Sequence, residues 1–323
     1  MSSGIEWTDE TWNPVTGCDK VSRGCDNCYA LRQAKRLKAM GSPRYQKDGD
    51  PRTSGPGFGV TCHEDALTKP FRWKTPRRIF VNSMSDLFHP DVPDEFIGSV
   101  FSVMARAPQH TFMVLTKRPK RMRDLLTKWV EKGSFRDQQK QWVQPATMPL
   151  PNVWIGVSIE SDQYCFRADL LRETPAAVRF LSLEPLLSAL PSLDLAGIDW
   201  VIAGGESGPK ARPMHPDWVR DIRDQCITAD IPFFFKQWGE YCPVRVVAEP
   251  HRCVLLGHDG TVLPHTSDED IPADRVMMVR EGKSRAGSIL DNVVWEERPG
   301  WQYRVDRRIN HEFRNMESCN RMR

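Results

Sequence analysis

The chain has 323 residues, with 45 Lys and Arg against 42 Asp and Glu, for a formal net charge of +3 at neutral pH. This length suffices for one large domain with additions or for two modest domains, and so weak a charge does not by itself indicate a partner. The N-terminus lacks the basic start and apolar run of a signal peptide, and no stretch is long and apolar enough to span a bilayer. We therefore expect a cytoplasmic protein with no membrane partner, whose cysteines stay reduced.

Short apolar runs rich in β-branched and aromatic residues recur along the chain, and each stops at a polar or glycine-bearing turn. Such runs are typical of buried parallel strands. They lie at 11–14, 79–82, 111–115, 153–157, 178–183, 200–203 and 233–235. Helical patterns separate most of them, at 30–40, 94–107, 121–132, 163–173 and 216–229. The alternation predicts an α/β fold with a parallel sheet, and six or seven strands with mostly single crossovers favour a full or partial (β/α) barrel.

Further segments interrupt or follow the barrel, which we expect over residues 1–240. Residues 41–75 include a glycine-, proline- and charge-rich stretch and are expected to form an inserted loop. A turn signal at 257–260 between two apolar runs predicts a hairpin. Residues 241–298 should therefore form a hairpin and lid-like extension, in which 283–291 with Trp295 could fold back over the site, and 299–323 a basic, arginine-rich tail.

Cys18, Cys25 and Cys28 lie within eleven residues in a glycine-marked loop. Cysteine clusters in a reducing compartment are usually metal ligands or catalytic residues, so we expect these thiols to bind a metal. Three ligands leave one position open, either on a zinc ion or on the unique iron of an iron–sulfur cluster. Cys62 or His63 could complete a zinc site. Free thiols or disulfides are the remaining alternative, although the nine cysteines are odd in number and otherwise scattered.

Polar side chains gather just after the predicted strands. Parallel strands bring their carboxyl ends to one edge, where α/β barrels build their sites, so these side chains should face one mouth. Among them, Lys236, Glu184 and Glu206 are the candidate catalytic residues. Burial could lower the pKa of Lys236 for acid/base or Schiff-base chemistry, although such a lysine more often pairs with a carboxylate, here Glu184, Glu206 or Glu240.

A series of short motifs runs through these loops. They are Trp12-Asn13-Pro14, Gly17-Cys18, Gly24-Cys25, Cys28-Tyr29-Ala30, residues 80–88, 115–118, 156–158, 183–186, 204–208 and 235–239. A strand, a three-cysteine loop and a barrel with polar strand ends resemble the radical S-adenosylmethionine superfamily. More narrowly, the chain is similar from residue 6 to about 297 to a phage-associated three-Cys-motif family without a settled biochemical function.

The resemblance implies that Cys18, Cys25 and Cys28 hold a 4Fe-4S cluster whose fourth iron binds S-adenosylmethionine. By position, Asn82, Ser83 and Ser85 are the candidates for contact with the amino group of this cofactor. The full set of candidate cofactor-binding residues is Tyr29, Asn82, Ser83, Ser85, Lys117 and Ser158. An electron from a reductant protein such as flavodoxin or ferredoxin would cleave the cofactor to a 5′-deoxyadenosyl radical.

The substrate class is predicted from charge. Basic residues at 117–123 lie beside the expected mouth and favour a phosphate-bearing substrate, although a charge run can also be a solvated face. We therefore expect an enzyme that modifies or repairs a nucleic acid or nucleotide. One alternative is a zinc-binding phage protein that binds nucleic acid without enzymatic activity. Another is a partner-binding phage or defence protein whose cluster is only structural.

Overall fold

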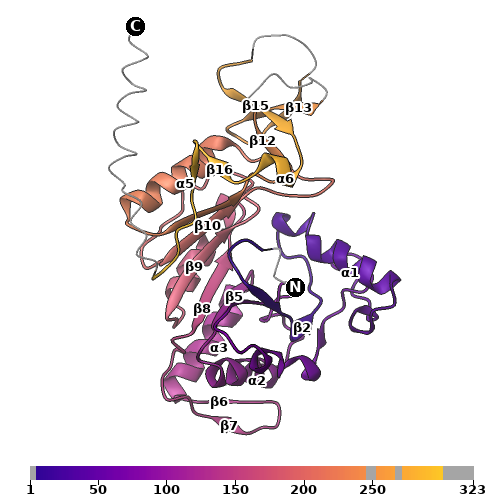
Figure 1. Cartoon of the computed structure of the whole chain (residues 1–323), viewed down its shortest axis with the longest axis vertical. Coiled ribbons are helices and arrows are strands. Elements are labelled where there is room, and N and C mark those ends of the chain that lie inside the picture. Colours follow the sequence, from indigo (N-terminus) through magenta and orange to yellow (C-terminus); the bar gives the residue numbers. More distant parts are fainter. Residues whose placement is uncertain (1–4, 245–251, 266–270, 301–323) are drawn as a thin grey trace.

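The computed structural model describes residues 5–244, 252–265 and 271–300. Its centre is a seven-stranded sheet with the order β1-β4-β5-β8-β9-β10-β11, in which every neighbouring pair is parallel. The strands are β1 (Glu10–Trp12), β4 (Arg78–Val81), β5 (Thr111–Thr116), β8 (Val153–Ser158), β9 (Val178–Leu183), β10 (Trp200–Gly204) and β11 (Phe233–Gln237). Because β11 does not pair with β1, the sheet is a half barrel (Figure 1). The predicted α/β fold is confirmed in its partial-barrel form.

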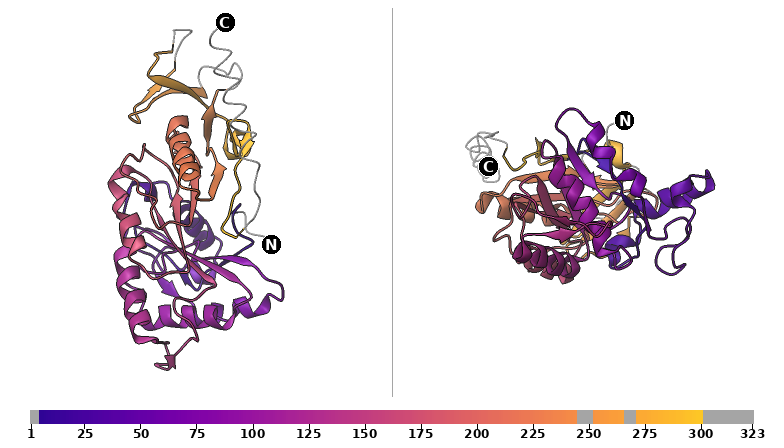
Figure 2. Two further views of the ribbon diagram at one scale, coloured as in Figure 1. Left: turned by 90° about the vertical axis from the view of Figure 1, so that its left-hand side faces the viewer. Right: turned by 90° about the horizontal axis from the view of Figure 1, so that it is seen from below.

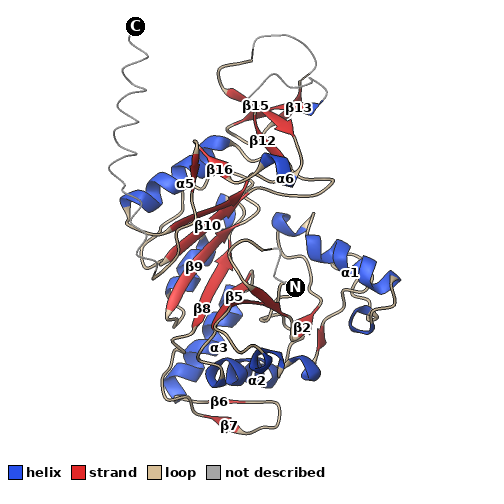
Figure 3. Cartoon of the chain, viewed as in Figure 1, coloured by secondary structure: helices blue, strands red, loops and turns tan. Residues whose placement is uncertain are grey.

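Five α-helices follow the order that the sequence predicts. They are α1 (Tyr29–Ala39), α2 (Asp94–Arg106), α3 (Pro119–Lys132), α4 (Phe166–Arg172) and α5 (Pro216–Thr228). Local signals fix their ends: Pro119 occupies the first turn of α3, where no N–H is needed, and Gly133 ends the helix with a φ of 61°. Figure 3 shows the helices in blue around the strands in red, and Figure 2 gives two further views of this arrangement. The connection from β9 to β10 contains no helix.

The period of two along each strand creates two different faces. Residues such as Phe112, Val114 and Ile155 point outward and join the large core beneath the helices. Their neighbours point to the concave face, where they form a second, mainly aromatic cluster. This cluster consists of Trp7, Phe80, Met113, Phe180, Trp200, Ile202 and Phe234. The inside of the half barrel is therefore packed at its floor.

Shorter elements surround the half barrel. The inserted segment contains β3 (Thr61–Cys62), which pairs with β2 (Val15–Thr16) of the cysteine region. It also contains three 3₁₀ turns, at Pro43–Tyr45, Glu64–Ala66 and Lys69–Arg72. A small hairpin of β6 (Phe135–Arg136) and β7 (Trp142–Val143) follows α3. The described ranges contain no helix long and apolar enough to cross a membrane.

The region after the half barrel forms a four-stranded antiparallel sheet with the order β12-β15-β13-β14. Its strands are β12 (Tyr241–Pro243), β13 (Cys253–Gly257), β14 (Val262–Pro264) and β15 (Arg275–Arg280). The predicted hairpin is confirmed, since β13 and β14 pair around residues 257–260. Figure 1 shows this sheet beyond the β10 end of the half barrel.

The last described segment covers the free edge of β11. It contains α6 (Lys283–Ala286), β16 (Ile289–Leu290) and β17 (Val293–Val294). The Phe235 N–H donates to the Trp295 carbonyl at 2.8 Å, and Phe234 forms an antiparallel bridge with Glu296. An edge covered in this way is closed to further pairing. From residue 301 on, the predicted basic tail lies outside the described residues.

Candidate functional site

The concave face changes from apolar to polar toward the carboxyl end of each strand. On β9, Phe180 belongs to the aromatic floor, and Ser182 and Glu184 follow it at intervals of two residues. On β11, Phe234 precedes Lys236 in the same way. The alternation therefore aims the polar side chains at the space above the floor.

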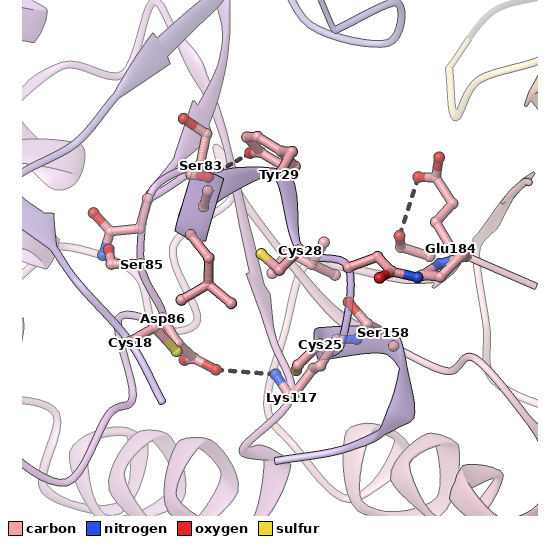
Figure 4. A pocket seen from close by; sticks show the side chains of 18 of the residues that line it. Cys18, Cys25, Cys28, Tyr29, Ser83, Ser85, Asp86, Lys117, Ser158 and Glu184 are labelled. Carbon is pink, nitrogen blue, oxygen red and sulfur yellow. Dashed lines mark hydrogen bonds between the residues drawn. The ribbon is translucent and has the colours of Figure 1, made fainter. Parts of the chain in front are cut away.

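All of the candidate site residues predicted from the sequence line one cavity of about 290 Å³ at this end of the sheet (Figure 4). They are Cys18, Cys25, Cys28, Tyr29, Asn82, Ser83, Ser85, Lys117, Ser158, Glu184, Glu206 and Lys236. The residues come from six strand ends and from the cysteine loop, which are separated by up to 218 positions between Cys18 and Lys236. The structure thus brings the set together, and the role of each residue stays a prediction.

The three cysteines that line the cavity lie next to three different elements. Cys18 follows β2, Cys25 ends a 3₁₀ turn at Arg23–Cys25, and Cys28 precedes α1 at its N-cap. Gly17 has a φ of 89°, and a Cβ atom there would lie 2.4 Å from the carbonyl oxygen of Gly59. Only glycine fits this turn, which brings the cysteine loop against the inserted segment.

Two of the three sulfurs have a hydrogen-bonding side chain beside them, and the third lies at a helix N-terminus. Arg118 donates from Nη1 to Cys18 Sγ at 3.4 Å. The backbone N–H groups of Ala30 and Leu31, at the start of α1, act to lower the pKa of Cys28. Ser22 Oγ lies 3.8 Å from the sulfur of Cys25. Donors of this kind stabilise negative charge on sulfur, so the loop fits an anionic metal–thiolate centre.

Burial keeps two of these thiols protonated when no metal is bound. Burial and the nearby Asp86 carboxylate raise the pKa of Cys18 to about 12, against the opposing effect of Arg118. Burial also raises the pKa of Cys28. Both are therefore neutral thiols at pH 7, and a bound metal centre would displace their protons.

The structure does not place Cys62 or His63 as a fourth zinc ligand at this cavity. Neither Cys62 nor His63 lines it. The Nε2 atom of His63 lies 2.8 Å from Thr16 Oγ1, and Cys62 packs against the main core. Within the described ranges, no group of three or more His, Cys, Asp or Glu side chains is placed to hold a single metal ion.

Three buried polar atoms in the cavity wall have no hydrogen-bond partner among the described residues. They are Asn82 Nδ2 and Trp7 Nε1, which are donors, and Gln237 Oε1, which is an acceptor. The amide of Asn82 is oriented by its Oδ1 atom, which accepts from the Val15 N–H at 3.3 Å. Buried polar groups are normally paired, so these atoms indicate a ligand with its own donors and acceptors.

Lys236 and Glu184 form an ion pair across the cavity, with 3.0 Å between Nζ and Oε1. Their side chains are 19% and 13% exposed. Burial acts to lower the pKa of Lys236, but the charge and hydrogen bond of Glu184 outweigh it, so the pKa is raised. The structure therefore shows the commoner arrangement expected for such a lysine, pairing with a carboxylate, and identifies Glu184 as the partner. Lys236 is a cation at neutral pH.

Glu206 is held by other protein groups. It accepts hydrogen bonds from Asn27 Nδ2 at 3.0 Å and from Arg212 at N, Nε and Nη2, at 2.9, 2.8 and 2.6 Å. Burial opposes ionisation, but the hydrogen bonds from Arg212 outweigh it and lower the pKa of Glu206. This carboxylate therefore connects the glycine-rich loop after β10 to the cysteine loop.

The remaining predicted cofactor residues are fixed by neighbours. Lys117 Nζ lies 3.3 Å from Glu160 Oε2, and Ser85 Oγ donates to the Val15 carbonyl at 2.8 Å. Tyr29 donates through its hydroxyl to the carbonyl of Ser83, as Figure 4 shows. These contacts hold the wall of the cavity in place.

Sequence reasoning missed four residues of the site. Trp7, Asn27 and Gln237 line the cavity, and Arg118 contacts a cysteine sulfur. Only Arg118 and Gln237 had a signal, because both lie in the polar clusters that follow predicted strands. The others required the fold, since Trp7 precedes the first strand and Asn27 reaches Glu206 across 179 residues.

Residues 2–299 match the model of a family described as protein of unknown function, DUF5131. The chain belongs to this family. A search among the curated proteins found no match. The phage association expected from the sequence stays a prediction.

Solved structures of spore photoproduct lyase show a distant likeness to this DUF5131 protein. A cysteine-to-serine mutant is 11% identical with a TM-score of 0.42, and the match covers 87% of this chain and 71% of that chain. A second mutant, with bound AdoMet and dinucleoside spore photoproduct, is 10% identical with a TM-score of 0.36, covering 84% and 68% of the two chains.

Proposed function

We propose that this chain is a radical S-adenosylmethionine enzyme that acts on a nucleic acid or nucleotide. Cys18, Cys25 and Cys28 would hold its 4Fe-4S cluster. The observation that carries the proposal is the arrangement of three cysteines, two of them beside a hydrogen-bonding side chain and one at a helix N-terminus, on one cavity at the carboxyl end of a parallel half barrel. When bound, the cluster and cofactor would supply an electron and a carbon-centred radical.

The protein's own residues position and shield this chemistry. The unpartnered donors Asn82 Nδ2 and Trp7 Nε1 would bind acceptor atoms of the cofactor, and Gln237 Oε1 would accept from one of its donors. The aromatic floor excludes water below the cavity. The ion pair of Lys236 and Glu184 presents both charges to a substrate at neutral pH.

The choice of a nucleic acid or nucleotide is supported by the cations at the mouth. Lys117 and Arg118 line the cavity, and both also face the surface groove that adjoins it. Each is held by a buried carboxylate, Glu160 for Lys117 and Asp86 for Arg118. Fixed cations of this kind suit phosphate recognition.

The first test is the metal content of the full chain purified without oxygen. We expect about four iron and four sulfide per chain, lost in a variant with Cys18→Ala, Cys25→Ala and Cys28→Ala. A Cys62→Ala variant is the control, because Cys62 lies outside the cavity and its replacement should leave both contents unchanged. The reduced protein should then convert S-adenosylmethionine to methionine and 5′-deoxyadenosine.

Two outcomes would overturn the proposal. One zinc per chain without sulfide would favour the zinc-binding alternative. Iron and sulfide without any cleavage of S-adenosylmethionine would instead favour a cluster with a structural role.

A further inference from the structure

A second groove, of about 750 Å³, adjoins the cavity. Val21, Lys117 and Arg118 line both, so the groove and the cavity adjoin at these residues. The groove is formed by α3 as far as Lys128 and by the start of α4 with the 3₁₀ turn before it, at Asp162–Tyr164. A chain lying in this groove would therefore pass beside the cavity.

Cations dominate the lining of the groove. The cationic residues are Lys117, Arg118, Lys120, Arg121, Lys128 and Arg167, and the acidic residues are Asp94 and Asp124. The carboxylates of Glu160 and Asp86 lie behind the groove and contact three of these cations, yet the six cations still outnumber the four acids. The groove therefore keeps an excess of two cations after these four acids are counted.

The outer cations are available to a ligand. Lys120 pairs with Asp124 at 3.0 Å, but the two side chains are 77% and 48% exposed. Ion pairs this exposed contribute little to stability, so a phosphate can replace the carboxylate. Lys128 is likewise exposed, two turns further along α3.

An aromatic side chain stands among these cations. Phe166, at the start of α4, is 51% exposed, and its ring centroid lies 6.4 Å from that of Tyr164. The guanidinium of Arg167 lies over the Tyr164 ring, 4.2 Å from its centroid. A single exposed apolar residue needs no explanation. An exposed ring beside a row of cations, however, matches the surface on which proteins stack unpaired bases.

We propose that this groove binds a single strand of nucleic acid, with phosphates along Lys120 and Lys128 and one base stacked on Phe166. A single strand fits better than a duplex, because a base must be unstacked to meet the ring. It also fits better than an acidic peptide, which would use the cations but leave Phe166 without a flat partner. The inference deepens the proposed function by naming the form of its substrate, and binding itself does not depend on the cluster.

The test is fluorescence anisotropy with labelled single-stranded DNA and RNA of about 12 nucleotides, within the usual range of such sites. The full chain, purified without oxygen, is titrated over a range of salt concentrations. The variants are Lys120→Gln with Lys128→Gln, and Phe166→Ala. The control is Lys74→Gln with Lys132→Gln, which removes the same charge from exposed positions before β4 and at the end of α3, at the opposite end of the sheet.

The two variants should weaken oligonucleotide binding in different ways. The lysine variant should bind about tenfold more weakly at low salt and lose about 1.4 from the slope of log K against log salt, because two phosphate contacts are gone. Phe166→Ala should weaken binding by roughly five- to hundredfold with an unchanged slope, since stacking releases no counterions. The control should match the unmodified chain.

Several results would overturn the inference. Equal losses in the lysine variant and the control would show general charge attraction. Tighter binding of duplex DNA, with no effect of Phe166→Ala, would rule out a single strand. Failure to bind either oligonucleotide, with polyglutamate bound in a lysine-dependent way, would favour an acidic protein. If the metal test fails while these binding results hold, the groove stands without the proposed function.

Discussion

Arg118 donates a hydrogen bond from Nη1 to the sulfur of Cys18 at 3.4 Å, while the same nitrogen lies 3.3 Å from Oδ2 of Asp86. Asp86 is buried and also accepts from Thr116 Oγ1 at 2.7 Å and from the Lys117 N–H at 3.1 Å. A carboxylate at the end of one strand thus orients a guanidinium at the end of the next toward a cysteine. The cation is held where it can stabilise negative charge on a metal-bound sulfur.

Replacing Arg118 should change the reduction potential of the cluster that we propose. In Arg118→Met the cation beside the Cys18 sulfur is gone, so the reduced, more negative cluster is less stable. We expect the midpoint potential to fall by about 60 mV, equivalent to a factor of ten for one electron. The measurement is a redox titration followed by electron paramagnetic resonance. Lys120→Met, which removes an exposed cation two residues further along the chain, should leave the potential unchanged. Equal potentials in both variants would contradict the role assigned to Arg118.

The effects of replacing Lys236 and Glu184 on the free energy of unfolding should be strongly non-additive. Lys236→Met leaves a largely buried carboxylate without its partner, so we expect the free energy of unfolding to fall by about 3 kcal/mol. The double variant with Glu184→Gln should recover most of this loss, because no charge is then unpaired. Urea unfolding of the two single variants and the double variant measures the coupling. Additive effects would show that the pair is not formed in solution.

Gly205 permits the close approach of the loops after β10 and β11. A Cβ atom at this position would lie 1.9 Å from the backbone oxygen of Trp238, which cannot move independently of its strand. Gly205→Ala should therefore lower stability by about 2 kcal/mol, a typical cost of overpacking. In Gly204→Ala the nearest atom is the end of the Glu184 side chain at 3.0 Å, so its loss should be smaller. Chemical denaturation of both variants tests this order, which equal losses would contradict.

Acid should destabilise the fold through His215. This buried side chain caps α5, with Nδ1 accepting from the Asp217 N–H at 3.2 Å. Burial, opposed by Asp217 and reinforced by His258 and Arg220, lowers the pKa of His215 below its ordinary value of 6.5. The unfolded chain then binds the proton more readily, so the stabilisation is complete above pH 6.5 and is lost as the pH falls below it.

The matched variant for this prediction is His215→Asn. Asparagine is a favourable N-cap that does not titrate, so the variant should lose less stability between about pH 7 and pH 5. His63 and His89 also have lowered pKa values through burial, so part of the loss should remain. Urea unfolding at both pH values gives the comparison. An identical pH dependence of the two proteins would contradict the role of His215.

Much of the architecture could be predicted from local patterns. The apolar runs predicted each of the seven main strands to within a few residues, because buried parallel strands are continuous apolar segments bounded by turns. The same patterns placed Asn82, Lys117 and Ser158 at strand ends. Parallel pairing then obliges these ends to share an edge, which is why they line one cavity.

The partners of these side chains could not be predicted in the same way. Three candidate partners for Lys236 could be named from the sequence, namely Glu184, Glu206 and Glu240. In the structure Lys236 pairs with Glu184. Glu206 instead accepts hydrogen bonds from Arg212 and Asn27. A strand's period fixes which face a side chain points to, but not which of several carboxylates on neighbouring strands it reaches. That choice depends on register and loop packing.

By itself, then, the sequence determined the alternation of strands and helices, the polar strand ends and the three-cysteine loop, all of which follow from patterns a few residues long. The tertiary structure decided that the sheet stays open, with β11 covered by residues 295–297 instead of by β1. It also decided that Arg118 meets Cys18 across 100 residues. Such contacts depend on the curvature of the sheet and on long-range packing, for which a local pattern carries no signal.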